Sequence, residues 1–279
     1  MKTLKTAFLL TALTLLLLFL GAAFGGERGM TLALVFAVLM NGTAYFFSDK
    51  IALMSSGAQP ISKEQAPRLY EVMERLAAKS NLPMPKMYLI PQAAPNAFAT
   101  GRNPSHASVA VTQGLLELMD DEELEGVIAH ELSHVRNYDI LTSSIAATIA
   151  GAITWVARMG FWFGGGGDSR ERGSGLTGIL MLILAPLAAL LLQMGVSRQR
   201  EYQADASGAK MIGHPYGLIR ALEKLGAYNK RIPMDVPPTT SALMIVQPLS
   251  AGQIFSSLFS THPPLADRIA QLRAMTVTH

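Results

Sequence analysis

The sequence predicts a mixed α+β fold, mostly helical, in which four transmembrane helices carry a hydrophilic domain. Half of the 279 residues are hydrophobic and only 15% are charged, whereas soluble domains carry roughly 25% charged residues. Four long apolar stretches account for this composition, and the hydrophilic stretches between them combine helical and strand-like periodicities. These observations indicate a membrane protein that also has a folded domain outside the bilayer.

The composition also limits the possible partners. The formal net charge is +3, and the Lys and Arg residues are scattered rather than gathered into a stripe. Nucleic acid is therefore not an expected partner, and the small excess of cations suits loops that lie against the anionic surface of a lipid bilayer. The chain has no cysteine, which excludes disulfides and thiolate metal sites.

The first two apolar stretches predict a transmembrane helical hairpin within residues 1–47. Residues 6–26 and 30–47 contain no charged side chain, and about 20 apolar residues suffice to cross a bilayer as a helix. The link at 25–29 has the composition of a turn. A cleaved signal peptide is the alternative for the first stretch, because Lys2 and Lys5 precede it and small residues follow it. The second apolar stretch close behind favours the hairpin.

A second transmembrane hairpin is predicted within residues 140–196. Its two apolar stretches cover residues 140–157 and 174–196, and the first is rich in the small residues that suit close helix packing in lipid. A buried pair of soluble helices is the alternative, since neither stretch is a long run of leucine.

Charges beside the four stretches predict the orientation in the membrane. On one side the flanking cations are Lys2, Lys5, Lys50, Arg136, Arg198 and Arg200. The charges of each of the two opposite loops, at 27–28 and 168–172, sum to zero. The positive-inside rule then places both termini and the hydrophilic parts, residues 48–139 and 197–279, in the cytoplasm.

The first hydrophilic part, 48–139, contains signals for helices and for short strands. The pattern at 62–65 is that of a capping box, which would begin a helix with one apolar face formed by Leu69, Val72, Met73 and Leu76. Residues 86–90 and 107–112 predict strands. The acidic run at 120–123 predicts the start of another helix. Residues 197–279 predict several further helices.

This acidic helix carries the sequence His130-Glu131-Leu132-Ser133-His134. Because residues four apart lie on one face of a helix, His130 and His134 can bind one cation. Glu131 can then take a proton from a water molecule that zinc activates and pass it to a leaving amine. The alternative is a chance match on an acidic surface helix. The helical context favours a zinc site with Glu131 as catalytic base.

A catalytic zinc ion normally has three protein ligands and one open position. Glu201 and Asp205, again four apart, follow the fourth apolar stretch. We expect Glu201 to be the third ligand and Asp205 to accept the free ring N–H of a ligand histidine, His130 in particular. The alternative is the solvated face of a charged helix. His134 and Glu201 can share an ion only if the chain between them crosses the membrane an even number of times, which agrees with the predicted second hairpin.

Together with the segment Asn96-Ala97-Phe98-Ala99-Thr100-Gly101, these motifs resemble the HtpX family of bacterial heat-shock membrane proteases. The family is related to the eukaryotic CAAX prenyl-protease and to the Glu-zincins, and the resemblance covers nearly the whole chain. It implies a zincin-like metalloprotease domain with one zinc ion per chain, facing the cytoplasm from the bacterial inner membrane. It also implies a stress-response role in protein quality control, with damaged membrane proteins or unfolded polypeptides as substrates. His130, His134 and Glu201 would be the ligands and Glu131 the base.

Two further segments carry weaker expectations. Asn96, Ala97 and Phe98 resemble the start of the family's substrate-side strand, which could pair with an extended peptide; a turn followed by a core strand is the alternative. His262 could support the transition state through a hydrogen bond, but we expect it to cap the last helix.

Two other functions compete with a protease that works beside the membrane. A zinc-dependent scaffold without turnover would not need Glu131, and a structural site would normally close with a fourth ligand. An intramembrane protease would bury the acidic run at 120–125 in hydrocarbon at high cost. We therefore expect the site to lie just outside the third apolar stretch, close to the bilayer surface.

Overall fold

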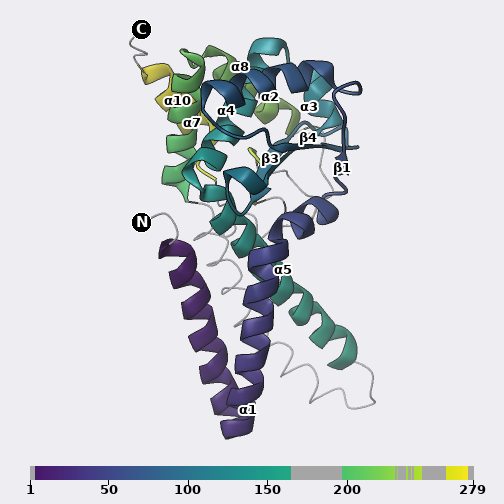
Figure 1. Ribbon diagram of the computed structural model, residues 1–279, viewed down its shortest axis with the longest axis vertical. Helices are drawn as coiled ribbons and strands as arrows, with labels where there is room; N and C mark the ends of the chain where they lie inside the picture. Colours follow the sequence, from purple (N-terminus) through teal and green to yellow (C-terminus); the bar gives the residue numbers. More distant parts are fainter. Residues whose placement is uncertain are drawn as a thin grey trace.

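The computed structural model describes residues 4–164, 197–229, 242–246 and 262–275, together with residues 231, 237 and 240. A domain of helices around a small sheet lies at one end of the molecule, and two long helices, α1 (Leu4–Ser55) and α5 (Asp139–Gly164), project from it (Figure 1). The predicted apolar helix at 174–196 lies outside the described residues.

Helix α1 is a hairpin of two arms, as predicted for the first two apolar stretches (Figure 1). The turn is at Gly26, whose φ of 58° and ψ of −144° leave the helical region and suit glycine. The arms approach closely at Gly21 and Gly29, where a Cβ on Gly21 would lie 2.5 Å from the Gly29 carbonyl oxygen. Higher in the hairpin, Asn41 Nδ2 donates to Thr14 Oγ1 at 2.9 Å. The two arms are therefore joined by close backbone packing and by a polar contact.

Among the described residues, one helix is long and apolar enough to cross a membrane. This helix is the second arm, Gly25–Ser55, with a mean hydropathy of 1.7. Thr6–Phe19 and Asp139–Gly151 form shorter apolar helices. Four transmembrane helices therefore remain a prediction.

The four strands form one sheet in the order β1-β2-β4-β3. Strand β1 (Gln59–Pro60) is antiparallel to β2 (Lys86–Ile90), which is parallel to β4 (Ala107–Thr112). Strand β3 (Ala97–Gly101) is antiparallel to β4 and forms the edge. The predicted strands at 86–90 and 107–112 are confirmed.

The two faces of the sheet pack against different parts of the chain. Met87, Val109 and Val111 belong to the main core, which they share with residues of α2 (Pro67–Lys79) and α4 (Asp121–Asn137). The opposite face packs against the C-terminal end of α1, in a smaller cluster that contains Ala52, Leu53, Ile90, Phe98 and Ala110. The alternation of side chains along a strand thus places the helical domain on one face and the hairpin on the other.

Helix α2 begins later than predicted. Of the capping box expected at 62–65, only one bond forms, from the Ser62 N–H to Gln65 Oε1 at 2.9 Å, and Ala66 is the N-cap. The helix starts at Pro67 because proline has a φ suited to the first turn and no N–H to satisfy there. The predicted apolar face is correct, since Leu69, Val72, Met73 and Leu76 are all buried.

Helix α4 is the central element of the domain. Asp120 caps its N-terminus by accepting from the Glu123 N–H, and Glu123 Oε2 accepts from the Asp120 N–H, both at 2.9 Å. The acidic start is therefore as predicted, and it complements the helix dipole. Helices α7 (Arg198–Ile212) and α8 (Tyr216–Asn229) pack against α4. Helix α10 (Leu265–Ala274) packs against α7 and α8 (Figure 1).

We expect Gly217→Ala to destabilise the domain. A Cβ on Gly217 would lie 2.1 Å from the Glu122 carbonyl oxygen, so α8 would have to move away from α4. Such overpacking costs about 1–3 kcal/mol, which exceeds the roughly 1 kcal/mol that alanine adds to helix propensity. Gly226→Ala in the same helix is the control, because its Cβ would meet only the flexible end of the Leu265 side chain. Thermal unfolding in detergent should show a lower midpoint for Gly217→Ala alone; equal midpoints would contradict the close packing of α4 and α8.

Candidate metal centre

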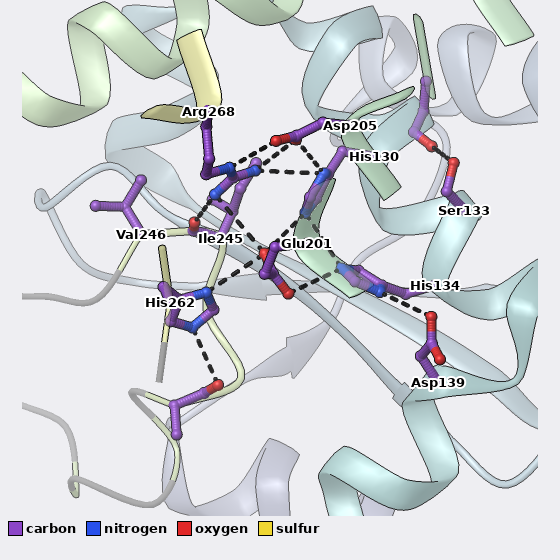
Figure 2. Close-up of polar contacts among 12 residues, drawn as sticks. His130, Ser133, His134, Asp139, Glu201, Asp205, Ile245, Val246, His262 and Arg268 are labelled. Atoms are coloured by element: carbon purple, nitrogen blue, oxygen red, sulfur yellow. Dashed lines mark hydrogen bonds and ion pairs between the residues drawn. The ribbon is translucent and has the colours of Figure 1, made fainter. Parts of the chain in front are cut away.

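Helix α4 directs two imidazoles to one point. His130 is buried and His134 nearly so, and their Nε2 atoms lie 3.2 Å apart because the residues are one helical turn apart. Figure 2 shows both rings facing the carboxylate of Glu201. The pairing predicted from the sequence is the arrangement observed.

Helix α7 brings Glu201 and Asp205 to the same place. Glu201 Oε1 lies 3.4 Å from His134 Nε2, and Glu201 Oε2 lies 3.6 Å from His130 Nε2. The close approach of the two helices depends on Gly208, where a Cβ would lie 3.1 Å from the His130 backbone nitrogen. A larger residue there would push Glu201 away from the histidines.

The three donors fit a zinc ion. One ligand atom each from His130, His134 and Glu201 lie within 4.8 Å of one another. Two nitrogens bound to one tetrahedral zinc are about 3.3 Å apart, close to the observed separation of 3.2 Å. Within the described part of the chain, Glu201 Oε2 is buried and has no hydrogen bond of good geometry, although His262 Nδ1 lies 3.3 Å from it. Such an oxygen is expensive to bury unless a cation or a donor binds it.

A carboxylate holds the far side of each imidazole. Asp205 Oδ1 lies 2.8 Å from His130 Nδ1, the contact expected from the sequence, and Asp139 Oδ2 lies 3.4 Å from His134 Nδ1. A proton on each Nδ1 would leave both Nε2 lone pairs directed to the centre. The role of Asp139 was not predicted. It follows Tyr138, which has a φ of 63° and redirects the chain after α4, and this turn returns the Asp139 side chain to the preceding helix.

Arg268 is a second contact that the sequence did not reveal. It is fully buried, and its guanidinium donates to both oxygens of Asp205 at 2.8 and 2.7 Å and to the Ile245 carbonyl at 2.8 Å (Figure 2). Burial alone would raise the pKa of Asp205, but Arg268 outweighs this effect and lowers that pKa to about 2. Asp205 is therefore an anion that can hold the N–H of His130.

Glu131 lies buried beside the centre. Burial is the main cause that raises its pKa to about 7, and the nearby charge of Glu201 adds to it, whereas His134 and the Ala99 backbone act in the opposite direction. A carboxyl group with this pKa can both accept and release a proton near neutral pH. Conversely, carboxylates raise the pKa of His134 to about 9 against the effect of burial.

A small cavity adjoins these groups. It measures about 30 Å³, which is room for water but not for a peptide. Its lining residues include Ala99, Glu131, His134, Glu201, Leu243 and His262. The site therefore has an open position that a water molecule can occupy.

His262 does not cap the last helix, so this expectation is wrong. Helix α10 begins at Leu265 after Pro264, and no side chain caps it. The chain turns at the two prolines, and His262 instead points into the site, with Nδ1 3.3 Å from Glu201 Oε2 and Nε2 3.2 Å from the Ala242 carbonyl oxygen. The ring of His262 thus forms part of the lining of the cavity.

The predicted substrate-side residues contact the chain itself. Asn96 Nδ2 donates to the Val246 carbonyl at 2.7 Å, and the Ile245 N–H donates to the Ala97 carbonyl at 2.9 Å. Phe98 is buried on the opposite face of the sheet. Ala99, one residue further along β3, is the strand residue that lines the cavity. Residues 242–246 therefore lie along the first part of the β3 edge.

The chain is similar to known proteins over nearly its whole length. The profile of peptidase family M48 matches residues 63–276. The chain is 56% identical to the protease HtpX homolog of Desulfatibacillum aliphaticivorans and 53% identical to that of Desulforapulum autotrophicum, covering in each case 96% of this chain and 88% of the relative. The crystal structure of S. mikatae Ste24p is similar with a TM-score of 0.54 at 21% identity, over 97% of this chain. This chain spans 64% of the length of Ste24p, and at this identity the likeness shows the fold alone.

We expect Arg268→Met to destabilise the protein strongly, because it leaves the buried carboxylate of Asp205 without its partner. Breaking a buried ion pair in this way costs about 3–5 kcal/mol. Arg273→Met in the same helix is the control, since Arg273 and its partner Glu223 have side chains that are 64% and 44% exposed, and exposed pairs contribute little. Thermal unfolding would contradict the importance of the buried pair if the two variants had equal midpoints.

Proposed function

Because this chain belongs to peptidase family M48 and to the HtpX proteases within it, it is a metalloprotease, and we propose that it is a membrane-anchored zinc endopeptidase. The family implies a metal ion, generally zinc. The observation that carries the proposal is the convergence of His130, His134 and Glu201 beside the buried carboxyl of Glu131. Two imidazoles and one carboxylate form a known ligand set of catalytic zinc, which leaves one position open.

The chain's own groups would move the proton. Bound zinc would polarise the scissile carbonyl and increase the acidity of water. Glu131 would accept a proton from the attacking water and deliver it to the amine nitrogen as the peptide C–N bond breaks. Burial raises the pKa of this carboxyl above its usual range in the metal-free site, which is a property that favours proton exchange. The Ala99 backbone, hydrogen-bonded to Glu131, would hold the carboxylate at the cavity.

The surrounding groups would position the ligands and stabilise the transition state. Asp205 and Asp139 would keep the two histidines in the tautomer that binds metal through Nε2. His262 lines the cavity next to Glu201, so its ring could donate a hydrogen bond to the oxygen that becomes negatively charged during attack.

The substrate would bind as an extended peptide along the edge of β3. Strand addition suits unfolded polypeptides because it requires main-chain hydrogen bonds rather than one particular side chain. Residues 242–246 would have to move, since the cavity beside β3 has a volume of only about 30 Å³. This requirement disfavours folded proteins and favours damaged or misfolded chains as substrates.

The proposed setting is the bacterial inner membrane, with both termini and the site in the cytoplasm. In this arrangement residues 1–47 and 140–196 form the two transmembrane hairpins, and residues 48–139 and 197–279 form the catalytic domain. One contact and one short connection support this arrangement. The end of α1 packs on the sheet, and α5 begins only two residues after α4 ends. Both would keep the site close to the bilayer, where misfolded membrane proteins, the proposed quality-control substrates, are found.

The proposed function is tested with Glu131→Gln, in which the amide cannot accept the proton. Unfolded casein is the substrate in detergent, and zinc content is measured on the same samples. We expect cleavage to fall by about 100-fold or more while bound zinc is unchanged. Glu125→Gln in the same helix is the control, because Glu125 pairs with Arg75 away from the site. Equal cleavage by Glu131→Gln and the wild type would refute the role of Glu131 as base.

The membrane arrangement is tested by cysteine labelling. The chain is suitable for this method because it has no native cysteine. Single cysteines replace Arg28 and Asp168 in the two loops expected outside, and Lys63 and Arg231 in the parts expected inside. A membrane-impermeant maleimide added to intact spheroplasts should label the first two positions, and the other two only after lysis. Labelling of Lys63→Cys or Arg231→Cys before lysis would contradict the four-span arrangement.

A further inference from the structure

A second polar hollow lies where the C-terminal ends of α2, α4 and α7 meet. It has a volume of about 660 Å³. Its lining includes three cations, Lys79, Arg136 and Lys210, and three neutral polar residues, Ser80, Asn137 and Ser207. No acidic side chain lines it among the described residues. This composition differs sharply from that of the metal centre, where carboxylates are abundant.

Within the described residues, the three cations do not neutralise acidic side chains. All three are exposed, and none forms an ion pair with an acidic residue of the described chain. Among the described residues, the side-chain hydrogen bond of this group is a long one, from Lys79 Nζ to the Ile212 carbonyl at 3.5 Å. In addition, Ser80 Oγ is buried and has no hydrogen-bond partner within the described residues. The hollow therefore offers positive charge and a hydroxyl that the described part of the chain does not satisfy.

Helix dipoles explain part of this charge but not all of it. Each cation lies in the last turn of its helix, where the dipole favours a positive side chain. A helix C-terminus carries about −0.5 elementary charge, so three helix ends amount to roughly −1.5 against the +3 of Lys79, Arg136 and Lys210. The hollow keeps a clear positive excess after the dipoles are compensated.

We propose that this hollow is a binding site for a phosphate group. Arg136 can present two parallel N–H donors to phosphate oxygens, and the two lysines add point charges from the neighbouring helices. The Asn137 amide and the two serine hydroxyls supply neutral donors. The volume is much larger than one phosphate requires, which leaves room for the group that carries it.

An anionic phospholipid headgroup is the source that the position favours. Arg136 and Asn137 end α4, and α5 starts at Asp139 and runs out of the domain beside α1 (Figure 1). This choice of source rests on the membrane arrangement proposed above, whereas the phosphate site itself does not. A lipid bound there would add a contact between the domain and the bilayer next to the start of α5.

The test measures binding to the full chain in a neutral detergent. The probes are short-chain phosphatidylglycerol, short-chain phosphatidylcholine and inorganic phosphate. The variant Lys79→Gln/Arg136→Gln/Lys210→Gln removes the three cations of the hollow, and Lys63→Gln/Lys86→Gln/Arg231→Gln removes three cations elsewhere on the surface as a charge-matched control. We expect the first variant to bind phosphatidylglycerol about 100-fold more weakly than the wild type, and the control to bind it nearly as the wild type does.

The outcomes separate the site from its source. Tight binding of phosphatidylglycerol, with weak competition from inorganic phosphate, supports a lipid site; equal competition supports a soluble phosphate compound. If the first variant binds every probe as tightly as the control variant, the proposal is wrong.

Two single variants decide the question if the triple variant is unstable, because Arg136→Lys keeps the charge and Arg136→Gln removes it. Phosphatidylglycerol affinity that is unchanged in both single variants would also overturn the proposal. Casein cleavage is not a readout here, so failure of this proposal is distinct from failure of the proposed protease function.

Discussion

The buried pair between Asp205 and Arg268 links most of the elements that build the metal centre. Asp205 lies on α7 and contacts His130 of α4, while Arg268 lies on α10 and also holds the Ile245 carbonyl. One guanidinium thus joins three separate segments that converge on the candidate metal ligands. Buried charges are stable only when they are paired and hydrogen-bonded, so this pair constrains how α4, α7 and α10 can pack. The orientation of the His130 ring is a consequence of that packing.

The charge of the whole site also favours a divalent cation. Four carboxylates, Glu131, Asp139, Glu201 and Asp205, lie close to two guanidiniums, Arg200 and Arg268. The acids therefore exceed the arginines by two charges, which is the charge of one zinc ion. In the metal-free site, burial is the main cause that raises the pKa of Glu131, and neighbouring carboxylates raise that of His134.

The position of residues 242–246 connects stability with access to the site. Asn96 and Ala97 bond to this segment, and Arg268 bonds to it from the other side. The Ile245 N–H satisfies the Ala97 carbonyl at the edge of β3, whereas Asn96 and Arg268 satisfy the carbonyls of Val246 and Ile245. In the proposed binding mode, a peptide would have to displace the Ile245 contact to pair with this edge.

The sequence by itself determined the features that depend on near neighbours in the chain. The spacing of His130 and His134, the position of Glu131, the strands at 86–90 and 107–112 and the turn of the hairpin all follow from local periodicity and turn chemistry. Glu201 could also be inferred as the third ligand, because it follows the fourth apolar stretch and lies four residues before Asp205, so that one helix can turn both side chains to the site. Only the tertiary structure decided the places of Asp139, Arg268 and His262 and the contact of Asn96 with Val246. Those contacts join residues that are distant in sequence or that follow a change in chain direction at Tyr138, and their geometry depends on how whole helices pack rather than on any local pattern.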